Sequence, residues 1–252
     1  MVPEVVRLAV RTPRDSAKAW EGYWSRVRTT GTHGEVLWDA DIGPEAEQYS
    51  KVIQTSMDST LPVLDVGCGN GQWTRWLADR FPTALGVDVA GSAVQRATEE
   101  SRDLPGVSFR ALDLTAPRAG EMLHEEYRDM NVFVRGVFHV LRPRQREELG
   151  RNLLDVVGRS GRVLLTETNY RGNPLSYMQS LGARPGSIPG PLRKAIGGIP
   201  VPGHFGRSER QAAFPEGAWE VLADGPVTIQ AVPMNGRTTT SIPGYLAMMR
   251  VR

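Results

Sequence analysis

One short stretch, Val63–Gly71 (VLDVGCGNG), holds the residue types best suited to binding a small ligand. Its glycines alternate in the turn Gly67–Gly71, which follows an apolar run containing Asp65. Glycine lacks a Cβ, so such a turn lets a ligand approach the backbone closely. A dinucleotide-binding turn would carry a further glycine where this chain has Gln72. Because Asp65 would also repel a pyrophosphate, the turn favours a ligand with positive charge.

Two further acidic residues follow at the ends of the next two predicted strands. Asp88 lies 21 residues after Gly67, where a carboxylate can accept hydrogen bonds from both hydroxyls of a ribose. Asp113 closes the following strand and could meet the amino group of an adenine. Adenosine joined to a cationic, amino-acid-like tail suits all three carboxylates, and S-adenosylmethionine has that chemistry.

The elements that must position these residues form an alternating pattern. Apolar runs typical of buried strands are separated by stretches whose apolar residues recur at helical spacing. The predicted strands cover 62–66, 84–89, 107–111, 131–135 and 162–167, and the predicted helices cover 72–80, 92–102 and 144–157. This order predicts a Rossmann-like α/β fold with a doubly wound, mostly parallel sheet. Such sheets bind ligands at the carboxyl ends of their strands, where the turn and the acidic residues lie.

Outside this pattern we expect helices in 16–57, with a break at Thr30–Gly34. The segment 169–210 is rich in glycine and proline, and its irregular pattern predicts a long insertion. After a short run at 219–224, the apolar runs 227–232 and 244–251 could pair as an antiparallel hairpin at the sheet edge. The expected organisation is a helical lid in 1–58 and a core in 59–252, with an acceptor lid inserted at 169–210.

Four motifs, in order along about residues 60–168, resemble those of class I S-adenosylmethionine-dependent methyltransferases. VLDVGCGNG is similar to the first motif of that family, GVDVA to the second, ALDL to the third, and NVFVRGVFHVLRP to the fourth-strand motif. RVLLTE resembles the fifth strand. The resemblance implies cofactor contacts from these motifs and from the N-terminal helix, namely Tyr23, Asp65, Gly67, Cys68, Gly69, Gly71, Asp88, Val89, Asp113 and Leu114.

Arg135, at the end of the fourth strand, and His139, shortly after it, each have more than one interpretation. In several oxygen methyltransferases of this class a histidine at the similar place removes the proton of the acceptor, which makes His139 the candidate general base. The alternative is that His139 only caps or packs beneath the site. Arg135 could bind the carboxylate of the cofactor or an anionic acceptor, or it could form a structural ion pair. Nucleic-acid adenine methyltransferases carry an Asn/Asp-Pro-Pro-aromatic motif where this chain has Val134–Val137, which disfavours a nucleobase as acceptor.

The resemblance implies methylation of a small molecule, and we expect O-methylation of a hydroxyl or carboxylate on a secondary metabolite or lipid-like compound. Alternatives are C- or N-methylation of a natural product, a fold repurposed for cyclisation or rearrangement, and a non-catalytic binding module. The stretch 171–208 has basic residues and no acidic ones, which suggests an anionic or carrier-bound acceptor. A solvated loop in an arginine-rich chain explains the same charges.

The amino-acid composition excludes several other classes of protein. The 252 residues include 30 basic and 28 acidic ones, and a net charge of +2 gives no indication of nucleic-acid binding. The single cysteine excludes an internal disulfide and a cysteine-cluster zinc site, and the four histidines have no metal-binding spacing. The first 15 residues lack the apolar core of a signal peptide, and no apolar run is long enough to span a membrane. We therefore expect a cytoplasmic protein without a metal; the oligomeric state stays open.

Overall fold

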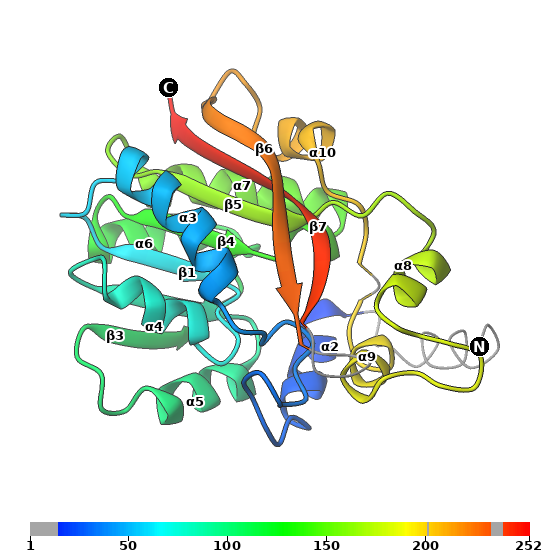
Figure 1. Ribbon diagram of the computed structural model, residues 1–252. Helices are drawn as coiled ribbons and strands as arrows, with labels where there is room; N and C mark the ends of the chain where they lie inside the picture. The colour runs from blue at the N-terminus through cyan, green and yellow to red at the C-terminus, as the bar shows by residue number, and fades with distance from the viewer. Residues whose placement is uncertain (1–14, 201, 233–238) are drawn as a thin grey trace.

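The computed structural model describes residues 15–200, 202–232 and 239–252, which fold around one seven-stranded sheet (Figure 1). The strand order is β3-β2-β1-β4-β5-β7-β6. The strands are β1 (Val63–Val66), β2 (Ala84–Asp88), β3 (Val107–Ala111), β4 (Asn131–Arg135), β5 (Val163–Thr168), β6 (Trp219–Ala231) and β7 (Thr240–Val251). β1 to β5 pair in parallel, whereas β7 pairs antiparallel with both β5 and β6. The predicted Rossmann-like sheet with an antiparallel edge is confirmed.

Helices cover both faces of the sheet because successive residues of a strand point to opposite sides. Leu64 of β1 belongs to the apolar cluster that contains Leu153 of α7. Its neighbour Val63 belongs to the cluster on the other face, with Leu77 of α4. The flanking helices are α3 (Gly43–Ser56), α4 (Gln72–Ala78), α5 (Gly91–Glu100), α6 (Ala119–Tyr127), α7 (Pro143–Val157) and α10 (Arg207–Ala213).

The N-terminal helix α2 (Ser16–Trp24) is fastened at the carboxyl edge of the sheet. Asp15 caps it by accepting a hydrogen bond from the Lys18 backbone N–H at 3.2 Å. Further along the helix, the Glu21 carboxylate accepts hydrogen bonds from the backbone N–H and the hydroxyl of Ser92, at the start of α5. The predicted helices in 16–57 correspond to α2 and α3, joined by an irregular link. Residues 1–14, for which the sequence predicts no signal peptide, lie outside the described residues.

The segment predicted to be irregular contains short helices that periodicity does not reveal. α8 (Pro174–Ser180) and α9 (Gly190–Ile196) each span seven residues, as does α10. The Asn173 side chain caps α8 by accepting from the Ser176 backbone N–H at 2.8 Å. Apolar residues of α8 and α9 form one cluster with the ends of β6 and β7, and these four elements lie together in Figure 1. Helices this short depend on tertiary packing, so apolar spacing alone could not predict them.

β6 corrects the prediction of two separate runs at 219–224 and 227–232. It is a single strand with a register shift between Val221 and Ala223. Because β6 is the outermost strand, Pro226 can lie within it without breaking a central ladder. Residues 233–238, between the two runs predicted to pair as a hairpin, lie outside the described residues.

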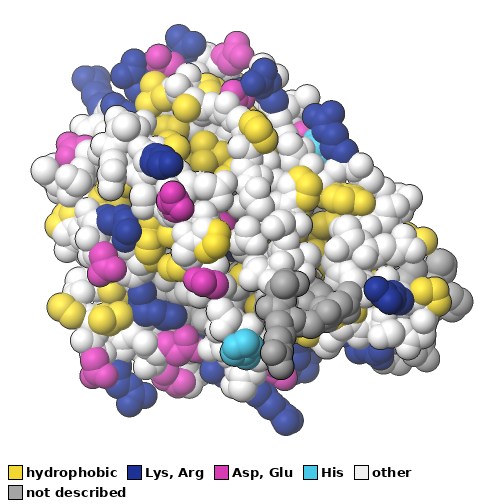
Figure 2. Space-filling model, in the orientation of Figure 1, with side chains coloured by type: hydrophobic (Ala, Val, Ile, Leu, Met, Phe, Trp, Pro, Cys, Tyr) yellow, Lys and Arg dark blue, Asp and Glu magenta, His cyan; other side chains and the backbone are white. Residues whose placement is uncertain are grey.

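The surface shows how the charges are distributed. On the face in Figure 2, Lys and Arg side chains are interspersed with Asp and Glu over the described residues. Nucleic-acid binding relies on clustered basic side chains that neutralise successive phosphates. This face presents mixed charge instead.

Candidate functional site

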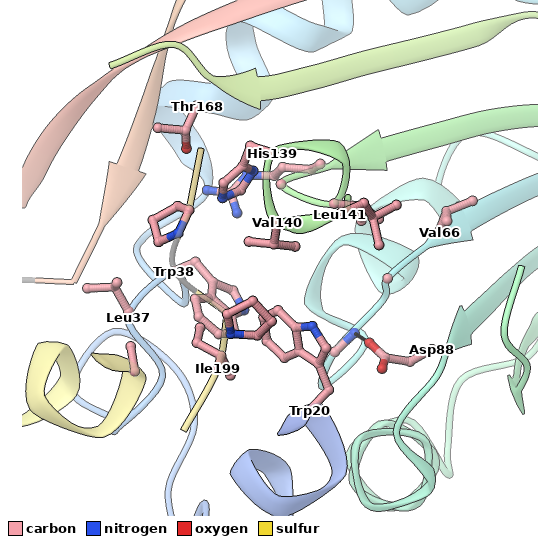
Figure 3. A pocket seen from close by; sticks show the side chains of 18 of the residues that line it. Trp20, Leu37, Trp38, Val66, Asp88, His139, Val140, Leu141, Thr168 and Ile199 are labelled. Atoms are coloured by element: carbon pink, nitrogen blue, oxygen red, sulfur yellow. Dashed lines mark hydrogen bonds between the residues drawn. The ribbon is translucent and has the colours of Figure 1, made fainter. Parts of the chain in front are cut away.

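A cavity of about 440 Å³ lies at the carboxyl ends of the parallel strands. That position and that size are typical of small-molecule sites in open α/β sheets. Its lining includes the turn after β1, the end of β2, the loops after β3 and β4, and residues of α2, α8, α9, β6 and β7. In Figure 3, Asp88 and Trp20 lie at one side of the cavity, and Thr168 and Leu37 lie at the other.

The glycine turn is shaped by packing against protein side chains. Gly67 and Gly69 have φ angles of +72° and +54°, which favour glycine. A Cβ on Gly67 would come within 2.5 Å of a Val137 methyl carbon, and one on Gly69 within 2.8 Å of the Trp24 ring. From the sequence alone, these glycines are expected to let a ligand approach the backbone. The structure shows that they also let α2 and the loop after β4 pack against the turn.

Asp88 is held by the turn that it faces. Its two carboxylate oxygens accept hydrogen bonds from the backbone N–H groups of Gly69, at 3.0 Å, and Ala90, at 2.9 Å. Burial raises the pKa of Asp88 to about 6. Each oxygen keeps acceptor capacity toward the cavity, because a carboxylate oxygen has two lone pairs.

Asp65 and Asp39 add two more buried carboxylates to the lining. The Thr74 hydroxyl donates to Asp65 at 2.6 Å, and burial raises the pKa of Asp65 to about 7. Asp39 accepts from the Gly31 backbone N–H and the Asn70 amide, and burial raises its pKa to about 6. Sequence reasoning missed Asp39 because it lies in the irregular link between α2 and α3, where no motif marks it.

The other predicted cofactor contacts take different positions. Val89, Cys68 and Leu114 line the cavity, as does Asp113, an exposed residue whose carboxylate accepts from the Thr115 N–H and hydroxyl. Gly71 is not among the lining residues. Burial raises the pKa of the Cys68 thiol well above its usual value, which keeps it protonated.

Tryptophans near Tyr23 line the cavity, and the predicted Tyr23 itself does not. Tyr23 is fully buried and is not among the lining residues. Trp20, Trp24 and Trp38 line the cavity, and the Trp20 and Trp38 rings lie 5.6 Å apart in an edge-to-face arrangement. Helical spacing can place the aromatic residues of a helix on one face, but it does not decide which of them turns toward a cavity.

His139 lines the cavity from the single-turn helix η1 (Phe138–Val140). Its Nδ1 lies 2.6 Å from an Oε atom of Glu167, which is fully buried on β5. Glu167 also accepts hydrogen bonds from the backbone N–H groups of Val137, Phe138 and His139. One carboxylate thus fixes both the short helix and the imidazole. Because an ionised carboxylate only accepts hydrogen bonds, this contact assigns the proton of the neutral imidazole to Nδ1, which leaves Nε2 with a lone pair.

Arg135 has its partner within the protein. Its guanidinium makes two hydrogen bonds to the Glu45 carboxylate of α3, at 2.8 and 2.7 Å, and both side chains are buried. Burial alone lowers the pKa of Arg135, but the facing Glu45 carboxylate more than offsets this, and the net shift is upward. Although Arg135 lines the cavity, the geometry favours the structural ion pair between the two roles predicted for it.

Of the other histidines, His204 also lines the cavity, which the sequence did not indicate. It is brought there by the loop before α10, where the Gly203 N–H donates to the His139 carbonyl at 2.8 Å. Within the described residues, no group of three His, Cys, Asp or Glu side chains is arranged to hold a metal ion. The same part of the chain contains no helix with the length and apolar character to cross a membrane.

Comparison with known proteins agrees with this geometry. A family model described as a methyltransferase domain matches residues 63–161. A SAM-dependent methyltransferase from Anabaena variabilis has a TM-score of 0.83 and 28% identity, over 96% of this chain and 97% of that one. The N-methyltransferase NodS from Bradyrhizobium japonicum, solved with S-adenosylhomocysteine, has a TM-score of 0.56 and 16% identity, over 94% and 99%. No curated protein matches the sequence.

A third solved structure comes from work on the conversion of a disulfide bond into a thioacetal group during echinomycin biosynthesis. It has a TM-score of 0.63 and 18% identity, over 85% of this chain and 84% of that one. At this identity the likeness concerns the fold. The sheet topology, the matched domain and the likeness to the Anabaena protein identify the chain as a class I S-adenosylmethionine-dependent methyltransferase.

The buried ion pair gives a prediction about stability. Replacing Arg135 by Met leaves the Glu45 carboxylate buried without its cation, which should lower the free energy of unfolding by about 3–5 kcal/mol. Urea denaturation measures the change. The matched control is Arg110→Met, which removes a half-exposed pair with Glu126 and should cost less than about 1 kcal/mol. Equal losses in the two variants would contradict the role assigned to burial.

The raised pKa values of Asp65 and Asp88 give a prediction about pH. A carboxyl with a pKa of about 7 or about 6 in the folded protein, against an ordinary value of 3.8, favours folding in its protonated form. Its contribution to stability is therefore lost as the pH rises through the raised pKa. Between pH 3.8 and about 7, the ordinary and the raised pKa of Asp65, the free energy of unfolding should fall less in Asp65→Asn than in the wild type. Identical pH profiles from urea titrations would contradict the assignment.

Proposed function

We propose that this methyltransferase transfers a methyl group to a hydroxyl oxygen of a small molecule, with His139 as general base. The observation that carries the proposal is the hydrogen bond between His139 and the buried Glu167, which points a free Nε2 lone pair away from the carboxylate. A proton acceptor on the cavity wall is what an alcohol or phenol needs in order to become a nucleophile.

The residues of the cavity fit S-adenosylmethionine by the chemistry of their donor and acceptor atoms. Asp88 would accept from the ribose hydroxyls, while Asp113, Val89 and Leu114 would surround the adenine. Asp65 and Asp39 supply negative charge near the glycine turn, where a cationic ligand would stabilise their ionised forms. When bound, the sulfonium supplies an already activated methyl group, so the protein needs no metal to make the methyl group reactive.

The protein's own part is to orient the acceptor, exclude water and accept one proton. The carbon–oxygen bond would form as the carbon–sulfur bond breaks, leaving the thioether S-adenosylhomocysteine, and the hydroxyl proton would pass to His139 Nε2. Glu167 stabilises the resulting imidazolium through Nδ1, and its bonds to three backbone N–H groups keep the ring from rotating. The indoles of Trp20, Trp24 and Trp38 support exclusion of water, since they close one side of the cavity with apolar surface. We further propose that α8 and α9 cover the acceptor.

Methyl transfer to nitrogen is the second candidate, and an amine that binds as its neutral form could use the same base. The readout that separates oxygen from nitrogen is the mass and fragmentation of the methylated product. A fold repurposed for rearrangement would give product with no gain of a methyl group.

The base role predicts the behaviour of three variants in a methyl-transfer assay with any hydroxyl acceptor found by screening. His139→Ala should lower kcat by about 10²–10⁴-fold with little change in the affinity for S-adenosylhomocysteine. Glu167→Gln should lower kcat less and shift the pH profile, because a neutral amide no longer stabilises the imidazolium. The control is His204→Ala, which removes the other histidine lining the cavity.

If His139→Ala retains wild-type kcat, the imidazole is not the base and the oxygen-transfer proposal loses its support. If His204→Ala loses as much activity as His139→Ala, the effect belongs to the cavity wall in general. Calorimetric titration with S-adenosylhomocysteine shows in each variant whether the cofactor part of the site has survived.

A further inference from the structure

We infer that the acceptor is an uncharged molecule with an apolar body, which occupies a compartment between α8, α9 and the ends of β6 and β7. This inference rests on the proposed function, because it takes His139 as the place where the acceptor hydroxyl is presented. It also replaces the anionic or carrier-bound acceptor that the basic residues of 171–208 suggested.

The compartment is lined by the side chains that hold the segment on the sheet. Five residues belong to one buried apolar cluster and also line the cavity: Met178 of α8, Leu181 directly after α8, Leu192 of α9, Ile229 of β6 and Ile242 of β7. Their apolar surface would be removed from water by an apolar ligand, which favours binding by roughly 25 cal/mol per Å² of buried apolar area.

The compartment and the proposed base His139 belong to the same cavity. In Figure 3, Leu37 and Ile199 lie on the far side of the cavity from Asp88, with His139 and Thr168 bordering the same space. The uncharged polar side chains Thr168, Tyr170 and Tyr177 also line the cavity. These groups can accept or donate a hydrogen bond to an acceptor hydroxyl without a charge.

The charges of the lining argue against an anionic acceptor. Among the described residues, the carboxylates that line the cavity are Asp39, Asp65, Asp88 and Asp113, and the only Lys or Arg that lines it is Arg135. Arg135 already makes two hydrogen bonds to Glu45. A carboxylate on the acceptor would therefore find no unpaired Lys or Arg among the lining residues, and its desolvation would be left uncompensated.

The Lys and Arg residues of 171–208 do not supply such a cation, because none of them lines the cavity. Lys194 of α9 donates to the Arg26 carbonyl at 2.8 Å and to the Glu35 carboxylate at 2.6 Å. Arg207 forms a pair of hydrogen bonds with Asp224. Lys194 and Arg207 fasten the segment to the link after α2 and to β6, so their function is structural.

The test uses three probes that share one aromatic skeleton: naphthol, naphthoate and naphthylmethylammonium. Their dissociation constants are measured by calorimetry with S-adenosylhomocysteine at saturation, so that binding is scored without methyl transfer. We expect naphthol to bind at least about tenfold more tightly than either ion. Naphthoate or naphthylmethylammonium binding as tightly as naphthol would overturn the inference.

Two variants locate the probe. Leu181→Trp fills the compartment and should weaken naphthol binding at least about tenfold while leaving the affinity for S-adenosylhomocysteine unchanged. Met122→Trp is the control, because Met122 is half exposed on α6 and is not among the lining residues. Met178→Arg brings a cation into the compartment and should shift the preference from naphthol toward naphthoate.

A wrong acceptor compartment and a wrong proposed function would give different experimental results. If S-adenosylhomocysteine binds and methyl transfer depends on His139, but Leu181→Trp and Met178→Arg leave probe binding unchanged, the compartment is wrong and the proposed function stands. If Leu181→Trp fails to fold, as judged by circular dichroism, Met178→Arg alone decides. If no methyl transfer to oxygen is found, the proposed function fails whatever the probes show.

Discussion

The structure depends on how it buries acidic side chains at the carboxyl edge of its sheet. Taking a carboxylate out of water costs several kcal/mol unless hydrogen bonds or a cation compensate it. The buried acids of this edge are Asp39, Glu45, Asp65, Asp88 and Glu167, which come from five different segments of the chain. Each is hydrogen-bonded, and those bonds tie the surrounding loops to the strands.

The buried acids form two groups, according to whether their partners offset the cost of burying the carboxylate. Glu45 meets a guanidinium, and Glu167 meets three backbone N–H groups and an imidazole. Asp65, Asp88 and Asp39 keep raised pKa values because their partners do not offset burial. The first group holds the scaffold, and the second faces the cavity with unused capacity for positive charge. A cationic nucleoside cofactor is the complement of the second group.

The walls of the cavity come from parts of the chain that are far apart in sequence. Trp24 of α2 rests against Gly69, so that the helix and the glycine turn define one surface. On the opposite side, α8 and α9 are held by the same apolar residues that line the cavity. A change in either segment therefore alters the shape of the site as well as the stability of the packing, because interiors are close-packed.

The sequence by itself determined the order of strands and helices, the glycine turn, and the acids at strand ends. These features are local: apolar period, glycine content and the position of a carboxylate after a strand can be read within a dozen residues. The sequence also indicated His139 as a candidate base, because this residue follows a recognisable strand. The partner that orients it was not indicated, since Glu167 lies 28 residues away and reaches it only through the pairing of β4 with β5.

Tertiary structure alone decided the rest. It paired Arg135 with Glu45 across a separation of 90 residues, brought Asp39 and His204 to the cavity, and turned Trp20 rather than Tyr23 toward it. It also placed the cations of the segment 171–208 away from the lining. The physical reason is that ion pairs and cavity walls depend on which surfaces meet after packing, and apolar periodicity specifies which face of an element is buried without specifying the residue that it meets.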